Sequence, residues 1–134
     1  DESLFPMIDY FTPNETEAGF YVDHNVETHE DAEKAAMKLL EKGIKNVIIT
    51  LGEKGAFFAN NDKKFSLPIA NLSNPVVDTT GAGDAFNAGF AAAIIEGQNI
   101  KDALKFASAT AGLSTTKIGT ANSMPSREEI EKIL

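Results

Sequence analysis

The chain has 134 residues, of which 43% are hydrophobic and 24% charged, and this composition fits one soluble globular unit with a core of its own. Its formal net charge of -8 argues against nucleic acid or an anionic membrane as a partner. The absence of cysteine excludes structural disulfides and thiolate metal sites. The longest apolar run, at residues 88–95, is far too short to span a bilayer, and we expect a cytoplasmic protein.

The first elements predicted are a short strand at residues 8–11 and a helix directly after it. Thr12 can cap this helix, and Glu15 would complete a capping box with it. Asn14 and Glu17 lie three residues apart, so on a helix they share one face. In the simplest interpretation this stretch is an acid-rich first turn, which the helix dipole favours.

A second helix is predicted for residues 28–42, because apolar residues recur at helical spacing and a glycine follows. Thr28 and Asp31 have the spacing of a helix start. His24 and His29 flank this region and have no partner at ligand spacing. We therefore expect both histidines to be surface residues and not metal ligands.

Residues 46–51 form a continuous β-branched run, which is typical of a strand buried on both faces of a parallel sheet. The glycine loop at residues 52–55 follows its carboxyl end, the edge where open α/β sheets bind ligands. This loop lacks the pattern of a phosphate-binding P-loop. Because another apolar strand starts at residue 56, the loop can equally be a hairpin turn. A turn at residues 60–62 and a strand at 63–67 follow.

The most informative stretch is Asp-Thr-Thr-Gly-Ala-Gly-Asp at residues 78–84, between an expected strand end at 75–77 and an apolar helix at 85–96. Its small residues leave the first N–H groups of the helix uncovered, and such groups bind an anion. A carboxylate in this position, Asp84, makes most sense if a group beside the anion must lose a proton. Alternatively, Asp84 only stabilises the positive end of the helix dipole.

The remaining chain predicts a helix at about residues 100–116, with small residues suited to close packing on another helix. A loop at residues 118–125 follows it. Ser126 and Glu129 then have the spacing of a capping box that opens a short terminal helix.

The stretch at residues 78–84, with Phe86 and Gly89 after it, resembles the C-terminal signature of the ribokinase-type (PfkB) carbohydrate kinase family. Other stretches match this family in order over nearly all of the chain. The resemblance corresponds to only the C-terminal part of such a kinase, since the chain has no Gly-Gly signature and no counterpart of the small β lid. The first residue, Asp1 and not Met, fits a trimmed or partial chain.

The resemblance implies the C-terminal portion of a ribokinase-like three-layer α/β/α fold with a mostly parallel sheet. In it, residues 1–134 would form one nucleotide-binding and catalytic portion. The activity implied is ATP-dependent phosphoryl transfer to a hydroxyl of ribose or a related sugar. Asp84 would be the base, and the turn of Gly81, Ala82 and Gly83 with Asp84 would receive the negative charge of the moving phosphoryl group.

The resemblance also implies the ligands around this centre. Thr50, Gly52 and Gly55 would lie against ATP, and Ser108 would lie near the adenine. Asn14 and Glu17 would arrange Mg²⁺ through its waters and the phosphates.

A monovalent cation, K⁺, is implied beside the turn. Asp78 and the carbonyl of Thr80 would bind it from one side, and Gly119 and Ser123 from the other. The alternative for Asp78 is an Asx-turn, in which its carboxylate accepts the N–H of Thr80 or Gly81.

Two hypotheses remain open at this stage. The chain is the catalytic part of a sugar kinase, or it is a folded kinase fragment that binds nucleotide or nothing and has no turnover by itself. A sheet that lacks its other half exposes an edge. We therefore expect the chain to associate with itself or with the absent N-terminal portion.

Overall fold

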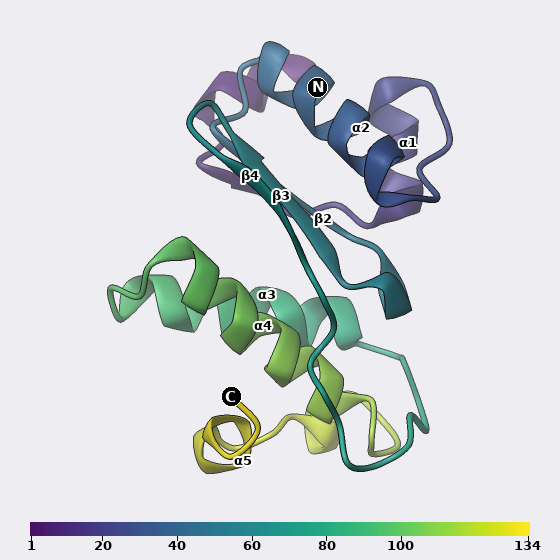
Figure 1. Cartoon of the computed structure of the whole chain (residues 1–134), viewed down its shortest axis with the longest axis vertical. Helices are drawn as coiled ribbons and strands as arrows, with labels where there is room; N and C mark the ends of the chain where they lie inside the picture. Colours follow the sequence, from purple (N-terminus) through teal and green to yellow (C-terminus); the bar gives the residue numbers. More distant parts are fainter. The chain divides into compact units, whose positions relative to one another are not determined.

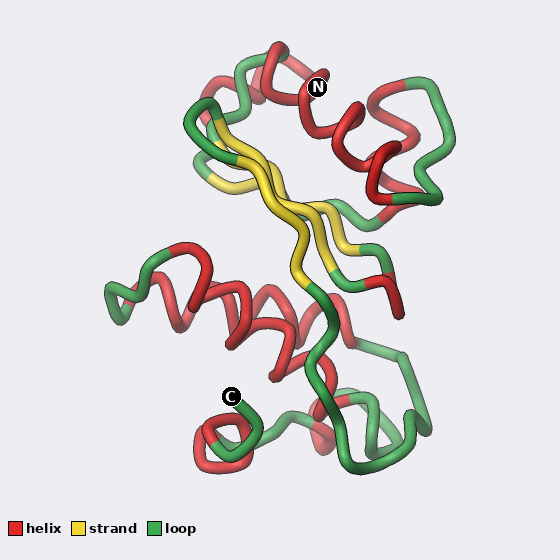
Figure 2. The backbone as a smooth tube through the Cα atoms, in the orientation of Figure 1, coloured by secondary structure: helices red, strands yellow, loops and turns green.

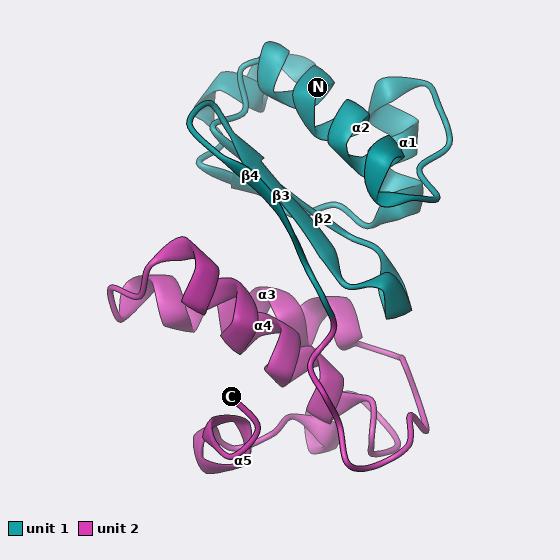
Figure 3. Cartoon of the chain, viewed as in Figure 1, with its two compact units in different colours: residues 1–68 teal, residues 69–134 magenta.

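The computed structural model describes all residues from 1 to 134, and these form two compact units, Asp1–Pro68 and Ile69–Leu134 (Figure 3). None of the helices combines the length and the apolar character needed to cross a membrane. The first unit contains a sheet and helices, whereas the second is helical (Figure 2).

The first unit begins with a 3₁₀ helix, η1, and contains four strands and two α-helices (Figure 1). All of its elements match predicted ones except the 3₁₀ helices. In chain order, the elements of the first unit are η1 (Glu2–Met7), β1 (Tyr10–Phe11), α1 (Glu15–Val22), α2 (His29–Glu41), β2 (Asn46–Thr50), η2 (Gly52–Lys54), β3 (Ala56–Asn60) and β4 (Lys64–Leu67).

The four strands form one sheet in the order β1-β2-β3-β4. β1 pairs with β2 in parallel, whereas β2 with β3 and β3 with β4 are antiparallel. The α/β class is as predicted, but the sheet of this chain is mixed and not mostly parallel. The connections are the reason: residues 51–55 and 61–63 are too few for the crossover of about a dozen residues that a parallel pair needs.

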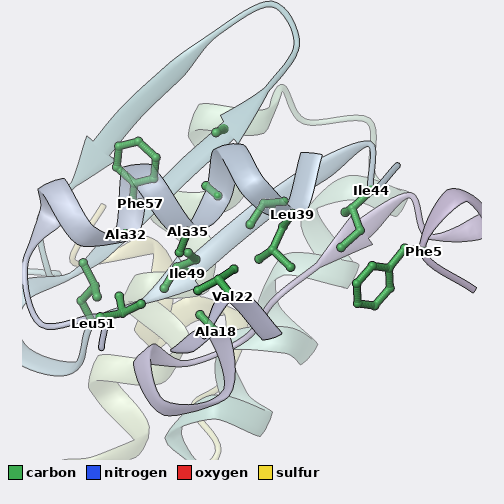
Figure 4. Close-up of a cluster of buried hydrophobic side chains, with 14 residues drawn as sticks. Phe5, Ala18, Val22, Ala32, Ala35, Leu39, Ile44, Ile49, Leu51 and Phe57 are labelled. Carbon is green, nitrogen blue, oxygen red and sulfur yellow. The ribbon is translucent and has the colours of Figure 1, made fainter. Parts of the chain in front are cut away.

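The core of the first unit lies between one face of the sheet and the two α-helices (Figure 4). The apolar stripe of α2 is buried as predicted, and β2 and β3 contribute alternate residues to the same cluster. The residues that α2, β2 and β3 bring to it are Ala32, Ala35, Ala36, Leu39, Val47, Ile49, Phe57 and Ala59.

Helix α1 begins later than predicted, because its N-cap is Asn14 and not Thr12. The carbonyl oxygen of Pro13 accepts the N–H of Thr50 at 3.0 Å, so the chain is still extended along β2 at this point. The capping box is therefore formed by Asn14 and Glu17, whose reciprocal backbone-to-side-chain hydrogen bonds both measure 2.9 Å. Helix α2 has the Thr28–Asp31 capping box that the sequence predicts.

The two histidines, predicted as surface residues and not metal ligands, are both half-buried. His24 follows the left-handed Asp23 at the end of α1, and its Nε2 is buried without a hydrogen-bond partner. His29 is the first residue of α2, and both of its ring nitrogens have partners. The partners of His29 lie 25 and 37 residues away in the chain, so sequence spacing could not reveal them.

The second unit consists of α3 (Ala82–Ile95), α4 (Ile100–Ser114), the 3₁₀ helix η3 (Ala121–Ser123) and α5 (Arg127–Glu131). α3 and α4 pack closely at Gly89, where an added Cβ would lie 2.6 Å from the Thr110 Oγ1 and 3.2 Å from the Ala107 Cα. Helix α5 opens with the predicted Ser126–Glu129 capping box.

The expected strand end at residues 75–77 is wrong, because this segment has no strand partner. The N–H groups of Val77 and Asp78 instead donate to the carbonyl oxygen of Thr115, at 2.7 and 3.1 Å. Thr115 is the C-cap of α4, where the last helix carbonyls lack partners in the helix. The segment is therefore held by a helix end.

Candidate active site

The N-cap of helix α3 is Gly81, a left-handed residue with φ of 77° that provides no side-chain cap. A side chain would be strained at this φ, and a Cβ would also lie 3.1 Å from the Cγ2 of Thr120. Both constraints require glycine here. The turn thus directs the backbone into the helix without covering its first amides.

The first amides of α3 differ in their partners. The N–H of Ala82 donates to the carbonyl oxygen of Thr79 at 3.1 Å, whereas the N–H groups of Gly83 and Asp84 have no acceptor in the chain. A Cβ added to Gly83 would meet no atom within 4 Å, so no side chain covers this position. In the turn predicted to receive negative charge, the amides of Gly83 and Asp84 are therefore open.

Asp84 lies in the first turn of α3 and is exposed. Its carboxylate makes no hydrogen bond or ion pair within the chain. The open amides and this unpaired carboxylate belong to consecutive residues at the N-terminus of α3.

Asp78 connects the turn to the loop after α4. One carboxylate oxygen accepts the N–H of Thr80 at 2.9 Å, which is the Asx-turn alternative, and the other accepts the N–H of Gly119 at 3.0 Å. These hydrogen bonds, with that from Gly119 the largest cause, lower the pKa of Asp78 from 3.8 to about 2. In the sequence analysis, Asp78 and Gly119 were related only as ligands of the same cation. The structure shows a direct hydrogen bond between them.

The low pKa of Asp78 predicts how the difference in stability between the wild type and Asp78→Asn depends on pH. The ionised carboxylate stabilises the folded state above the usual pKa of 3.8, and this contribution is lost as the pH falls through about 2. We expect Asp78→Asn to melt at a lower temperature than the wild type at pH 7, with the difference shrinking between pH 4 and pH 2. Circular dichroism melts over this range test it, and a difference independent of pH would contradict it.

Two other predicted site residues of the second unit have partners within the chain. The buried Ser123 donates its hydroxyl to the carbonyl oxygen of Thr120 at 2.7 Å. The half-buried Ser108 accepts the N–H of Ala70 through its hydroxyl oxygen at 3.1 Å. These hydrogen bonds hold the loop after α4 and the segment before the turn.

In the first unit, Thr50, Gly52 and Gly55 lie at the carboxyl end of β2 as predicted. The hairpin alternative is also confirmed, because this loop joins the antiparallel strands β2 and β3. Gly52 and Gly55 have φ of 53° and 89°, so the two glycines allow a compact 3₁₀ turn between them. The hairpin turn thus lies at the edge where the sequence predicted ligand binding.

Asn14 and Thr50 are neighbours, joined by an isolated parallel bridge that sequence spacing could not reveal. The start of α1 thus lies beside the end of β2. Glu15, which the sequence assigned to a capping box, has its Oε1 3.8 Å from the position of a Cβ on Gly52. No three His, Asp or Glu side chains gather as a metal site in the structure.

A family model described as pfkB family carbohydrate kinase matches residues 1–127. The chain belongs to this family. Among curated relatives, the ribokinase of Haemophilus influenzae is 41% identical over 133 residues, which are 99% of this chain and 43% of that protein. The deoxyribokinase of Salmonella typhi is 38% identical over 134 residues, with 100% of this chain and 43% of that protein covered.

Solved ribokinase structures share the fold. The structure of Arabidopsis thaliana ribokinase complexed with ribose and ATP has a TM-score of 0.93 at 37% identity, covering 99% of this chain and 43% of that one. The ribokinase of Thermotoga maritima has a TM-score of 0.88 at 41% identity, covering 99% and 44%. The ribokinase-like α/β fold is therefore confirmed, and the chain spans less than half the length of these relatives.

Proposed function

We propose that residues 1–134 supply the nucleotide-binding and catalytic portion of an ATP-dependent sugar kinase that acts on ribose or a related sugar in the cytoplasm. The observation that carries this proposal is the unpaired Asp84 carboxylate next to the open amides of Gly83 and Asp84. Family membership and the ribokinase and deoxyribokinase relatives support the substrate class.

The chemistry follows from these residues. The hydroxyl oxygen of the sugar attacks the terminal phosphorus of ATP, the bond from this phosphorus to the bridging oxygen breaks, and ADP leaves, while Asp84 accepts the proton of the hydroxyl. The amides of Gly83 and Asp84, in the turn formed with Gly81 and Ala82, stabilise the charge on the phosphoryl group. An uncovered helix N-terminus suits this task because its N–H groups are already oriented before the substrate arrives.

The nucleotide and the metals complete this proposal. Thr50, Gly52 and Gly55 contact ATP from the end of β2, as proposed from the family resemblance, and Ser108 lines the adenine side.

Mg²⁺, which requires oxygen ligands, fits Asn14 and Glu17 through water and phosphate oxygens. Each uses one side-chain oxygen in the capping box, and no cluster of three acidic or imidazole side chains surrounds them. The ion supplies charge neutralisation for the phosphates when it is bound.

K⁺ fits the Asp78 side of the turn. Both Asp78 oxygens accept one N–H each and keep lone pairs for a cation, beside the carbonyl of Thr80. Gly119 lies against the same carboxylate, and Ser123 belongs to the loop that follows. Such an ion supports the shape of the turn, and Asp78 already connects the two segments by direct hydrogen bonds.

A second candidate is a folded kinase fragment without turnover, in association with itself or with an N-terminal portion. Two observations favour it for the chain in isolation. The chain spans only 43% of the Haemophilus ribokinase. In the sheet order, β1 has only β2 as a neighbour, so it is an edge strand.

One assay separates these candidates. The 134-residue chain is incubated with ATP, Mg²⁺, K⁺ and either ribose, 2-deoxyribose or no sugar, and ADP release is measured. Sugar-dependent release above the background supports the kinase and contradicts the fragment hypothesis. Nucleotide binding without sugar-dependent release supports the fragment, and the two sugars reveal the preferred acceptor.

A further inference from the structure

The imidazole of His29, which lies outside the loop of residues 52–55, forms a hydrogen bond to this loop after β2. Nε2 of His29 lies 3.1 Å from the carbonyl oxygen of Lys54, the last residue of η2. Nδ1 of the same ring lies 3.1 Å from the hydroxyl oxygen of Ser66 on β4. One side chain at the start of α2 therefore links the loop to a strand of the sheet.

The partners determine where the proton of the ring lies. A carbonyl oxygen only accepts hydrogen bonds, so Nε2 of His29 must carry the hydrogen. In the neutral ring Nδ1 is then an acceptor, and the hydroxyl of Ser66 donates to it. The structure thus requires the Nε2–H tautomer of His29.

A second contact ties the same loop residue to the segment before α2. The Nζ of Lys54 donates to the carbonyl oxygen of Glu27 at 2.7 Å. Both the side chain and the carbonyl of Lys54 are thus attached to residues around the start of α2, although Lys54 itself is exposed.

The carbonyl of Lys54 also determines the orientation of the next amide. It belongs to the same planar peptide group as the N–H of Gly55, so holding one holds the other. That N–H donates to the carbonyl oxygen of Gly52 at 3.1 Å and closes the 3₁₀ turn. Gly55 has φ of 89° and ψ of -131°, a conformation that only glycine adopts readily, so the turn depends on glycine at this position.

We propose that His29 is a positioning residue that holds the loop of residues 52–55 in the shape that binds ATP. This inference rests on the proposed function, in which Gly52 and Gly55 contact the nucleotide. His29 acts only through the peptide of Lys54 and Gly55.

The test compares His29→Ala, His29→Gln and the control His24→Ala in the 134-residue chain. The dissociation constant for ATP is measured by calorimetry in the presence of Mg²⁺. We expect His29→Ala to weaken ATP binding about fivefold to tenfold, as the loss of one hydrogen bond of about 1 kcal/mol implies. His29→Gln, whose amide can still donate to the Lys54 carbonyl, should stay within about twofold of the wild type. His24, whose Nε2 has no partner, should be replaceable without effect on ATP binding.

NMR tests whether His29 holds the loop when no nucleotide is bound. The measured quantities are the chemical shifts of the His29 ring nitrogens and the hydrogen exchange of the Gly55 amide. We expect the Nε2–H tautomer of His29 in the wild type, and faster exchange of the Gly55 N–H in His29→Ala. An Nδ1–H tautomer, unchanged exchange, or wild-type ATP affinity in His29→Ala would each overturn the proposal. If the wild type binds no ATP and releases no ADP, the proposed function fails, whereas the tautomer and exchange still decide whether His29 holds the loop.

Discussion

Replacing Asp84 by Asn is expected to lower sugar phosphorylation by about a thousandfold while leaving the affinity for ATP within a few-fold of the wild type. An amide cannot accept the proton of the sugar hydroxyl, but it keeps the shape of the side chain and the backbone N–H of the residue. Since Asp84 has no partner within the chain, the substitution breaks no native contact. Steady-state kinetics with ribose and a separate ATP-binding measurement test this result in a protein with demonstrated kinase activity.

A matched control is Asp102→Asn, because Asp102 also lies in the first turn of a long helix. Its carboxylate is used locally, accepting from the side chains of Asn99 at 2.6 Å and Lys105 at 3.2 Å. The control should therefore lose some stability and no activity. If Asp84→Asn kept wild-type turnover, Asp84 would not be the base, and the proposed chemistry would need another proton acceptor.

The largest expected effect on stability is that of Gly89→Ala, at the contact of α3 with α4. Its new Cβ would lie 2.6 Å from Oγ1 and 2.9 Å from Cβ of Thr110, whose hydroxyl already donates to the Phe106 carbonyl at 2.7 Å. The helices must separate to admit the methyl group, at a cost of about 1–3 kcal/mol. We expect the melting temperature to fall by roughly 5–15 °C.

Gly83→Ala is the control on the same helix, because a Cβ there meets nothing within 4 Å. Alanine is favoured over glycine inside a helix by roughly 0.5–1 kcal/mol, so this variant should melt at the wild-type temperature or slightly above. It should nevertheless lose activity, since the methyl group occupies the space beside the open amides.

Equal melting temperatures of the wild type and Gly89→Ala would contradict the close contact between α3 and α4.

The sequence correctly predicted the features that depend on residues close together in the chain. The capping boxes of Thr28 with Asp31 and of Ser126 with Glu129 form as expected, since each joins groups one helical turn apart. The apolar period of α2 likewise predicted its buried face. The uncovered amides after Gly81 followed from the small residues of the turn.

Predictions that depended on distant partners were the ones that changed. The start of α1 moved to Asn14 because Pro13 still pairs with Thr50. The strand expected at residues 75–77 is absent because the C-cap of α4 takes its amides.

By itself, the sequence determined the family, the helix entrance with Asp84, and the glycine loop after β2, because residue types and short spacings carry these features. Only the tertiary structure decided that the sheet is mixed, that Asp78 accepts the N–H of Gly119, and that His29 supports Lys54. Each of these depends on hydrogen bonds between segments far apart in the chain. Such partners are selected by packing and loop length, and no local pattern records them.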